Sequence, residues 1–477
     1  MKTKIFPSIL IFFILLISFP TFGQSPIEQI KLPSPPELPS LSELPPLPEL
    51  PYLPEFLENF PTTPIKPEQD QKKRLWGDYI SEDINITIPG KTGMTIRIEH
   101  SFGDIDVRTG TNNQISITGE KRVSSGNEKS AQEFLEEMEL RIEEKPNIVE
   151  IRTHYPDERD RDRVKNFSIS YKIEIPENTD LQIENSFGDI DLRSVSGSFT
   201  ISNSFGKLTA EDLTGLTHLK NKFGELTAKT VNGDANITNE HGSLNITNVT
   251  GDLNANNRFG EISIYNVKGT SIISGGYGKM TIEELGNKAE LANSFGSIIC
   301  RDIYGETQIH NSHGKVEAEN MQGNTEIINQ FGSVEAITIN GDLYVKNGHS
   351  LVKVEDITGS VEVSNSFSPV NIKNIGGSVI VENRHGNITV DDILKKESSQ
   401  ERLVKLETSF GIINLTITER TSASISAKTT FGKIDCFFPV YLKSTSSNAL
   451  KISGKLGDEK DKIEIEGQNT SIYIKKY

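Results

Sequence analysis

The chain has 477 residues, and 50 Lys and Arg stand against 66 Asp and Glu, which gives a net charge of −16 at pH 7. This balance argues against charge-driven binding to nucleic acid, and two cysteines cannot build a disulfide framework or a four-cysteine zinc site. Only 35% of the residues are hydrophobic and 38 are glycine, which favours a thin β architecture over a thick α/β core.

Residues 1–23 are typical of a secretory signal peptide. A basic start with Lys2 and Lys4 precedes an apolar run over residues 5–19, and small residues before Gln24 suit cleavage. A retained membrane anchor is the alternative, which the shortness of the apolar run disfavours. No later stretch predicts a transmembrane helix, so we expect an exported chain at the cell surface, outside the cell or in the periplasm.

Residues 24–73 are expected to form a Pro-rich linker. The stretch 31–67 holds 12 of the 21 prolines, and the dipeptide Leu-Pro recurs along it with Glu interspersed. Because proline lacks an amide donor and fixes φ, this stretch is expected to sample extended polyproline II rather than helix or sheet. We interpret it as a semi-rigid spacer, with a Pro-rich ligand for a partner's groove as the alternative.

Residues 74–184 are expected to form an N-terminal cap. The segment 101–108 (SFGDIDVR) nearly duplicates 186–193 (SFGDIDLR), so one repeat unit precedes an interruption. Within the interruption, residues 130–142 carry apolar side chains among Glu and Gln and predict a short amphipathic helix.

Residues 185–394 contain an internal repeat of 18 residues. With Gly188 as position 0, ten of the twelve equivalent positions are glycine, and the exceptions are Ser350 and Ser368. Position −3 is Asn in eleven of twelve units, with Gly275 as the exception, and position −1 is always Phe, Tyr or His. Positions +2, +4 and +7 are apolar or small throughout, and position +9 is a second glycine in ten of eleven units. No insertion breaks the register, so each unit is expected to stack directly on the last.

This pattern predicts an all-β fold, a parallel β-solenoid with 18-residue coils. Apolar residues at +2 and +4, and again at +11 and +13, alternate with polar ones, so each coil carries two short strands with one buried face. Gly and Asn supply the turns because they tolerate positive φ. We predict twelve coils over residues 185–394. A C-terminal cap with degenerate coils is expected over residues 395–477, where the pairs Phe410-Gly411 and Phe431-Gly432 are irregularly spaced.

The repeated motif Asn-Ser-Phe-Gly-x-Ile/Leu resembles the bacterial putative-adhesin domain of β-strand repeats, a family long known only as a domain of unknown function. It is also similar to head domains described as putative autotransporter adhesins. The resemblance covers most of residues 80–470 and implies a right-handed β-helix at the cell envelope with an adhesive role. The chain departs from autotransporters because no C-terminal membrane-barrel segment is recognisable.

The aromatic column at position −1 is the candidate ligand-binding site. Its members are Phe187, Phe205, Phe223, His241, Phe259, Tyr277, Phe295, His313, Phe331, His349, Phe367 and His385. Stacked rings that pack a turn are one interpretation, and an exposed strip that binds sugar rings is the other. For the second, we single out Phe259, Tyr277, Phe295 and His313. Histidines on every second coil would lie about 9.6 Å apart, too far to share one metal ion.

Three other groups of residues have structural interpretations. The Asn column is expected to form hydrogen bonds along the stack and to satisfy backbone groups of the turns, with a row of ligand-binding side chains as the alternative. Asp104 with Asp106, and Asp189 with Asp191, form carboxylate pairs of the kind that cleave polysaccharides in some β-helices, but their outward positions favour a solvated face. Gly-Asp pairs elsewhere lack the full motif of calcium-binding β-rolls.

Cys300 falls four residues after the position-0 glycine Gly296, and Cys436 falls four residues after Gly432 of a degenerate coil. We expect both to be buried core residues without a redox role. No catalytic, cofactor-binding or metal-binding residue is predicted. The chain is therefore expected to be no enzyme but a binding module for an extended polymer or a surface protein. A structural envelope protein that self-associates end to end is the alternative, and a polysaccharide-active enzyme is a more distant one.

Overall fold

A computed structural model describes residues 79–394, 400–446 and 448–477. The chain divides into two units, Met1–Asp70 and Gln71–Tyr477, and all described residues belong to the second. The predicted signal peptide and Pro-rich linker lie outside the described residues.

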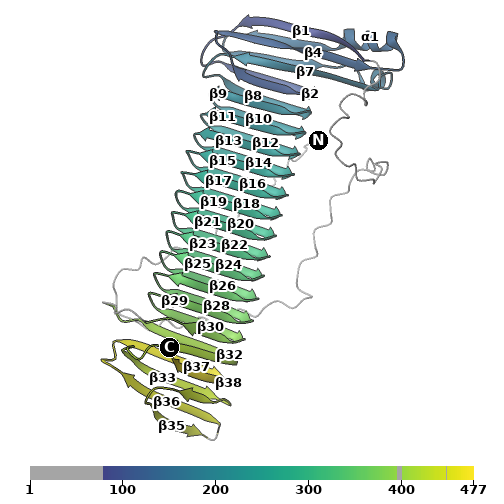
Figure 1. Ribbon diagram of the computed structural model, residues 1–477. Helices are drawn as coiled ribbons and strands as arrows, with labels where there is room; N and C mark the ends of the chain where they lie inside the picture. The colour runs from purple at the N-terminus through teal and green to yellow at the C-terminus, as the bar shows by residue number, and fades with distance from the viewer. Residues whose placement is uncertain (1–78, 395–399, 447) are drawn as a thin grey trace, which may run out of the picture. The chain divides into compact units, whose positions relative to one another are not determined.

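The second unit is built from two ladders of strands, called sheet A and sheet B here, and each 18-residue coil gives one strand to each sheet (Figure 1). Sheet A contains β9 (Ile190–Ser196), β11 (Leu208–Thr214), β13 (Leu226–Asn232), β15 (Leu244–Val249), β17 (Ile262–Val267), β19 (Met280–Leu285), β21 (Ile298–Ile303), β23 (Val316–Met321), β25 (Val334–Ile339), β27 (Val352–Ile357), β29 (Val370–Ile375) and β31 (Ile388–Asp391). Sheet B contains β8 (Asp180–Phe187), β10 (Phe199–Phe205), β12 (Thr217–Phe223), β14 (Ala235–His241), β16 (Leu253–Phe259), β18 (Ser271–Tyr277), β20 (Ala289–Phe295), β22 (Thr307–His313), β24 (Thr325–Phe331), β26 (Leu343–His349), β28 (Val361–Phe367) and β30 (Val379–His385). The all-β solenoid predicted from the repeat is confirmed.

Strands of successive coils pair in parallel, with equivalent residues opposite each other. Leu208 lies opposite Leu226 in sheet A, and Phe205 lies opposite Phe223 in sheet B. The apolar columns point between the sheets, so that Leu208, Ala210 and Phe199 are completely buried. This constant register carries every side-chain column of the repeat through the stack.

The position-0 glycines allow the coils to stack closely. Gly206 has φ +134°, and a Cβ there would lie 2.1 Å from the carbonyl oxygen of Gly188 in the coil before it. A side chain therefore meets both an unfavourable backbone conformation and a backbone clash. Ser350 occupies this position with φ 144°, and the hydrogen bonds on its two sides, Gly332 N to His349 O and Ser350 N to Phe367 O, are both 3.4 Å long.

A third turn column, at position +6, was not predicted. All twelve of its residues have φ between +52° and +65°, and none is glycine. They are Ser194, Asp212, Thr230, Asn248, Asn266, Glu284, Asp302, Asn320, Thr338, Asp356, Asn374 and Asp392. Eight of the twelve are Asn or Asp, the residues that tolerate the left-handed region best after glycine. That bias is the sequence signal that could have identified the turn.

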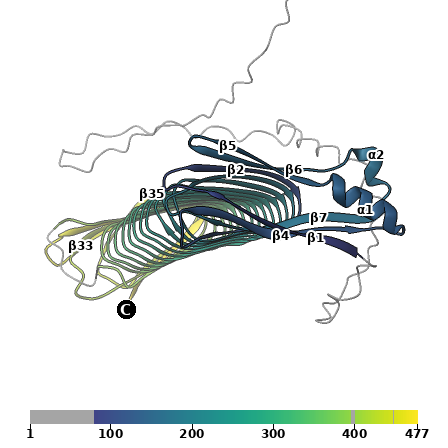
Figure 2. The ribbon, with the colours of Figure 1, turned by 90° about the horizontal axis from the view of Figure 1, so that it is seen from above.

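The N-terminal cap grows from an insertion in the first coil. Strands β2 (Thr95–Phe102) and β3 (Ile105–Thr109) form that coil and pair with β8 and β9. The insertion adds β4 (Gln114–Ser124), α1 (Glu128–Glu137), β5 (Glu139–Lys145), β6 (Ile148–His154), α2 (Glu158–Arg161) and β7 (Asn166–Ile175), and β1 (Tyr79–Pro89) pairs with β4. Both helices lie at one edge of the coils (Figure 2).

The helix predicted over residues 130–142 is shorter than expected. Its N-terminus is capped by Asn127, whose side-chain oxygen accepts hydrogen bonds from Lys129 N and Ser130 N. The chain becomes extended at Met138, because β5 pairs antiparallel with β6 from Glu139 onward. The prediction of helix beyond Glu137 was therefore wrong.

The C-terminal cap begins with β32 (Leu403–Ile417), one strand that runs from sheet B into sheet A through Phe410-Gly411. The remaining strands are β33 (Ala423–Thr430), β34 (Ile434–Cys436), β35 (Tyr441–Ser446), β36 (Ala449–Leu456), β37 (Asp461–Gln468) and β38 (Thr470–Lys476). Cys300 is fully buried, but Cys436 is only half-buried because β34 is the last strand of sheet A. The expected burial of Cys436 was wrong.

Candidate functional site

The aromatic residues at position −1 form a continuous stack of rings, called the ring column here. Each ring except that of Phe410, which lies within β32, belongs to the last residue of a sheet B strand, just before the position-0 turn. The strict register places each ring beside the ring of the next coil. The column contains Phe102, Phe187, Phe205, Phe223, His241, Phe259, Tyr277, Phe295, His313, Phe331, His349, Phe367, His385 and Phe410. Neighbouring centroids are 4.6–5.2 Å apart, and neighbouring planes are within 21° of parallel.

The four predicted ligand-binding residues are consecutive members of the ring column. The centroid distances are 5.0 Å from Phe259 to Tyr277, 4.9 Å from Tyr277 to Phe295 and 4.7 Å from Phe295 to His313. Tyr277 is 49% exposed and Phe295 is 43% exposed, whereas Phe259 is half-buried with the Arg258 guanidinium 5.1 Å from its ring centroid. Because neighbouring rings cover both faces, a ligand can reach the ring edges but cannot stack on a face.

The Asn column lies beneath the turns and hydrogen-bonds their backbone carbonyls, as predicted. The expected hydrogen bonds between stacked Asn side chains are not formed, because Oδ1 of column members such as Asn203 and Asn257 has no hydrogen-bond partner within the described residues. Asn257 is fully buried, and its Nδ2 donates to Gly242 O at 2.9 Å and to Glu261 O at 3.3 Å. The same geometry recurs at Asn203, whose Nδ2 donates to Gly188 O at 3.1 Å. Most of these amides thus join the turn of their own coil to the turn of the preceding coil, whereas Asn347 and Asn365 donate only within their own coils.

The Asp motif of the first two coils lies in an acidic hollow of 560 Å³ on the outer side of sheet A. Its acidic lining residues are Asp83, Asp104, Asp106, Glu120, Asp189 and Asp191, and Lys172 is its one basic lining residue. The structure therefore brings both predicted carboxylate pairs into one place. Strand pairing explains this, because Asp106 lies directly opposite Asp191 between β3 and β9.

These aspartates have partners within the protein. Arg108 Nη2 lies 2.8 Å from Asp106 Oδ2, and the equivalent Arg193–Asp191 distance is 2.6 Å. Asp104 Oδ1 accepts a hydrogen bond of 2.8 Å from the backbone N–H of Asp189 one coil later. Within the described residues, no group of three or more His, Cys, Asp or Glu side chains is arranged to hold a metal ion.

The Gly-Asp pairs weighed for calcium binding connect coils in the same way. Asp234 Oδ1 accepts a hydrogen bond of 2.9 Å from Asp252 N, and Asp252 Oδ1 accepts one of 2.8 Å from Thr270 N. These carboxylates therefore serve as hydrogen-bond acceptors between adjacent turns.

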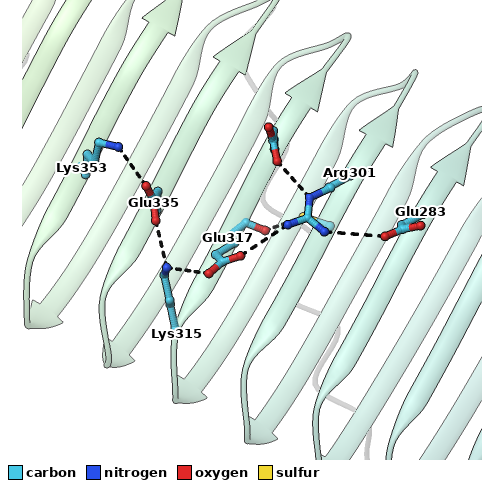
Figure 3. A network of polar contacts seen from close by, with 8 residues as sticks. Glu283, Arg301, Lys315, Glu317, Glu335 and Lys353 are labelled. Atoms are coloured by element: carbon cyan, nitrogen blue, oxygen red, sulfur yellow. Dashed lines mark hydrogen bonds and ion pairs between the residues drawn. The ribbon is translucent and has the colours of Figure 1, made fainter.

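From β19 to β27, the outer face of sheet A carries alternating charges that neutralise each other between coils (Figure 3). Arg301 lies 2.9 Å from Glu319 and 3.6 Å from Glu283, and Lys315 and Lys353 each lie 2.9 Å from Glu335. Hydrogen bonds from these two lysines lower the pKa of Glu335. Such exposed pairs add little stability, and they leave this part of the face without a strong net charge to attract a charged ligand.

A buried aromatic cluster in the first coil was not recognised from the sequence. His100 takes the place of the column asparagine opposite Asn185, and its Nδ1 lies 3.1 Å from Thr153 Oγ1. The rings of His100 and Tyr171 meet edge to face at 5.1 Å. Burial lowers the pKa of His100 to about 4 and raises the pKa of Tyr171.

The comparisons with known proteins leave the family open. No family model matches the chain, and no curated protein matches it. Among solved structures, one match is the crystal structure of a putative cell adhesion protein from Clostridium sporogenes ATCC 15579. It is 8% identical, the match covers 83% of this chain and 100% of that chain, and the TM-score is 0.15. A TM-score this low does not support a shared family or function. The resemblance to the putative-adhesin domain therefore rests on the repeat motif alone.

In the part of the chain that the structure describes, no helix is both long enough and apolar enough to cross a bilayer.

Proposed function

We propose that this protein is an exported, non-catalytic binding module whose ring column holds an extended ligand, a polysaccharide or the surface of another protein. The observation that supports this is the column itself: one ring per coil, without a gap from Phe102 to Phe410, and 41–49% exposed at most of its Phe and Tyr members. A regular strip of this kind suits a ligand that repeats along its length better than a compact small molecule.

The chemistry of the strip follows from the stacking. Ring edges carry the positive part of the aromatic quadrupole, so the exposed edges favour contact with hydroxyl, carbonyl or carboxylate oxygens of a ligand. Ser294 and Ser312 precede two of the rings and add hydroxyl groups beside them. The individual contacts are weak, and affinity would come from repetition along several coils.

The experiment is an array of glycans and envelope polymers probed with the mature chain from Gln24 onward. The test variant is Tyr277→Ala/Phe295→Ala, and the matched control is Tyr265→Ala/Tyr304→Ala, which removes two exposed tyrosines outside the ring column. We expect at least about tenfold weaker binding for the test variant and unchanged binding for the control.

Two results would contradict this function. If the test and control variants lose binding affinity equally, the ring column is not the binding site. If the folded wild-type protein binds no polymer, the ring column serves only to pack the turns. Export is tested separately by sequencing the N-terminus of the protein recovered from its native cells. A mature chain that begins at Gln24 supports export, and a chain that retains residues 1–23 contradicts it.

A further inference from the structure

The C-terminal end of the stack exposes the most apolar surface in the described part of the chain. The five large hydrophobic side chains with the greatest exposure are Tyr441 at 80%, Tyr477 at 70%, Leu442 at 69%, Phe437 at 63% and Phe431 at 60%. All of them belong to the last strands and turns. Exposed apolar surface concentrated in this way indicates an interaction site.

At this end of the stack, sheet B has more strands than sheet A. After β32, sheet B continues through β37, β33, β36 and β35, whereas sheet A continues only through β38 and β34. The inward face of the last sheet B strands therefore extends past the end of sheet A. Leu442 lies on this face, because it is opposite the buried Ile452 in β36.

The N-terminal end is uneven in the opposite sense. Before the first coil, sheet A continues through β7, β4 and β1, whereas sheet B continues only through β6 and β5. Here sheet A projects, and Ile86 and Ile88 on the inward face of β1 are only partly buried. β1 and β35 lie at opposite ends of the stack (Figure 1).

The two ends also carry opposite charge. Residues 79–184 contain 14 Lys and Arg against 22 Asp and Glu, a net charge of −8, whereas residues 423–477 contain 9 Lys against 6 Asp and Glu, a net charge of +3. At the N-terminal end, Glu143 and Glu144 are exposed on the edge strand β5. The N-terminal end of one copy therefore attracts the C-terminal end of another, whereas two identical ends repel each other.

We propose that a second copy of this chain docks head to tail, so that the C-terminal end of one copy continues into the N-terminal end of the next. The projecting sheet B strands of one copy would cover the projecting sheet A strands of the other, which places Leu442 against the inward face of β1. The contact is heterologous, so repeated docking extends a filament rather than closing a ring.

The strand edges permit this continuation. Among the described strands, β34, β35, β1 and β5 each pair with one neighbour only, namely β38, β36, β4 and β6. The chain directions allow β34 to pair in parallel with β1 of the next copy, and β35 to pair antiparallel with its β5. Backbone groups at both edges would gain hydrogen bonds.

The test is sedimentation velocity of the mature chain over a range of concentrations. Leu442→Lys blocks the C-terminal end, Glu143→Lys/Glu144→Lys blocks the N-terminal end, and Tyr304→Lys is the control, because Tyr304 is 57% exposed in the middle of the stack. We expect wild type and control to form concentration-dependent oligomers and both blocked variants to stay monomeric. An equimolar mixture of the two blocked variants should form a one-to-one dimer with about twice the mass of either alone.

Three results would overturn this proposal. If the wild-type chain stays monomeric at all concentrations, the chain does not self-associate and the proposal is wrong. Loss of association in Leu442→Lys alone, with normal association in Glu143→Lys/Glu144→Lys, would indicate a symmetric tail-to-tail contact. A monomer that floats with phosphatidylglycerol vesicles through Leu442 would assign this end to a membrane surface. Variants of the ring column should associate normally, which separates this proposal from the binding function.

Discussion

Arg402 and Asp461 form a buried, two-pronged ion pair, in which Nη2 lies 2.7 Å from Oδ2 and Nε lies 3.2 Å from Oδ1. The backbone N–H of Arg402 donates to the same carboxylate at 3.0 Å. The pair joins the residue before β32 to the first residue of β37, where the regular coils give way to the cap. Its burial distinguishes it from the charge network on the outer face of sheet A.

We expect Arg402→Met to destabilise the C-terminal cap by about 3–5 kcal/mol, because it leaves the Asp461 carboxylate buried without its main partner. The double variant Arg402→Met/Asp461→Leu should recover most of this loss. Arg301→Met, which removes three exposed ion pairs, should cost less than about 1 kcal/mol. Hydrogen exchange in β37 measures the effect locally, and equal losses in the two single variants would contradict the argument.

A second prediction concerns the serine in the glycine column. Ser350→Gly should stabilise the stack by about 1 kcal/mol, because glycine relieves a φ of 144° and allows the 3.4 Å hydrogen bonds on both sides to shorten. The reverse change, Gly296→Ser, would place a Cβ 2.0 Å from Gly278 O and should destabilise it. Thermal unfolding compares the wild type with the two variants. A lower midpoint temperature for Ser350→Gly than for the wild type would show that the backbone at Ser350 is not strained.

The Asn column supports a third prediction. Asn257→Ala should cost about 1–3 kcal/mol, because it removes the side-chain donor to the Gly242 carbonyl and leaves the Glu261 carbonyl with only the backbone N–H of Leu244. Asn257→Thr should cost less, since Thr408 occupies the same column in β32 and its hydroxyl donates to Gly386 O at 3.3 Å. Denaturant unfolding ranks the variants, and equal costs for Ala and Thr would show that the amide contributes only by packing.

The repeat made the coils predictable because each column of side chains has one structural task. Apolar +2 residues such as Leu208 fill the core, and glycines such as Gly206 permit close stacking, so both leave a strong signal in the sequence. The left-handed turn at +6 was missed because Asn, Asp, Thr, Ser and Glu all occupy it. Their shared feature is a tolerated backbone conformation rather than one residue type.

The caps could not be predicted in the same way, because they depend on pairing between distant segments. The chain after Met138 becomes a strand through its pairing with β6, which local helical spacing does not reveal. Cys436 keeps the core spacing of the repeat yet lies on the last sheet A strand, so nothing covers it fully. In the ring column, the sequence identified neighbours such as Tyr277 and Phe295 correctly but could not show that stacking covers their faces.

The buried His100 makes the N-terminal cap sensitive to acid. Its pKa is lowered to about 4 by burial, whereas an unfolded chain would hold it near 6.5. Below about pH 6.5 the His100 imidazole binds a proton in the unfolded chain but not in the folded protein. The stability that the folded protein has at neutral pH is therefore lost progressively as the pH falls toward 4. The full loss is about 3 kcal/mol. His100→Asn restores the residue of the column and should flatten this part of the pH profile, with little change at pH 8. Hydrogen exchange in β2 and β6 between pH 8 and pH 4 measures the difference, and parallel profiles for the two proteins would exclude His100 as the acid-sensitive group.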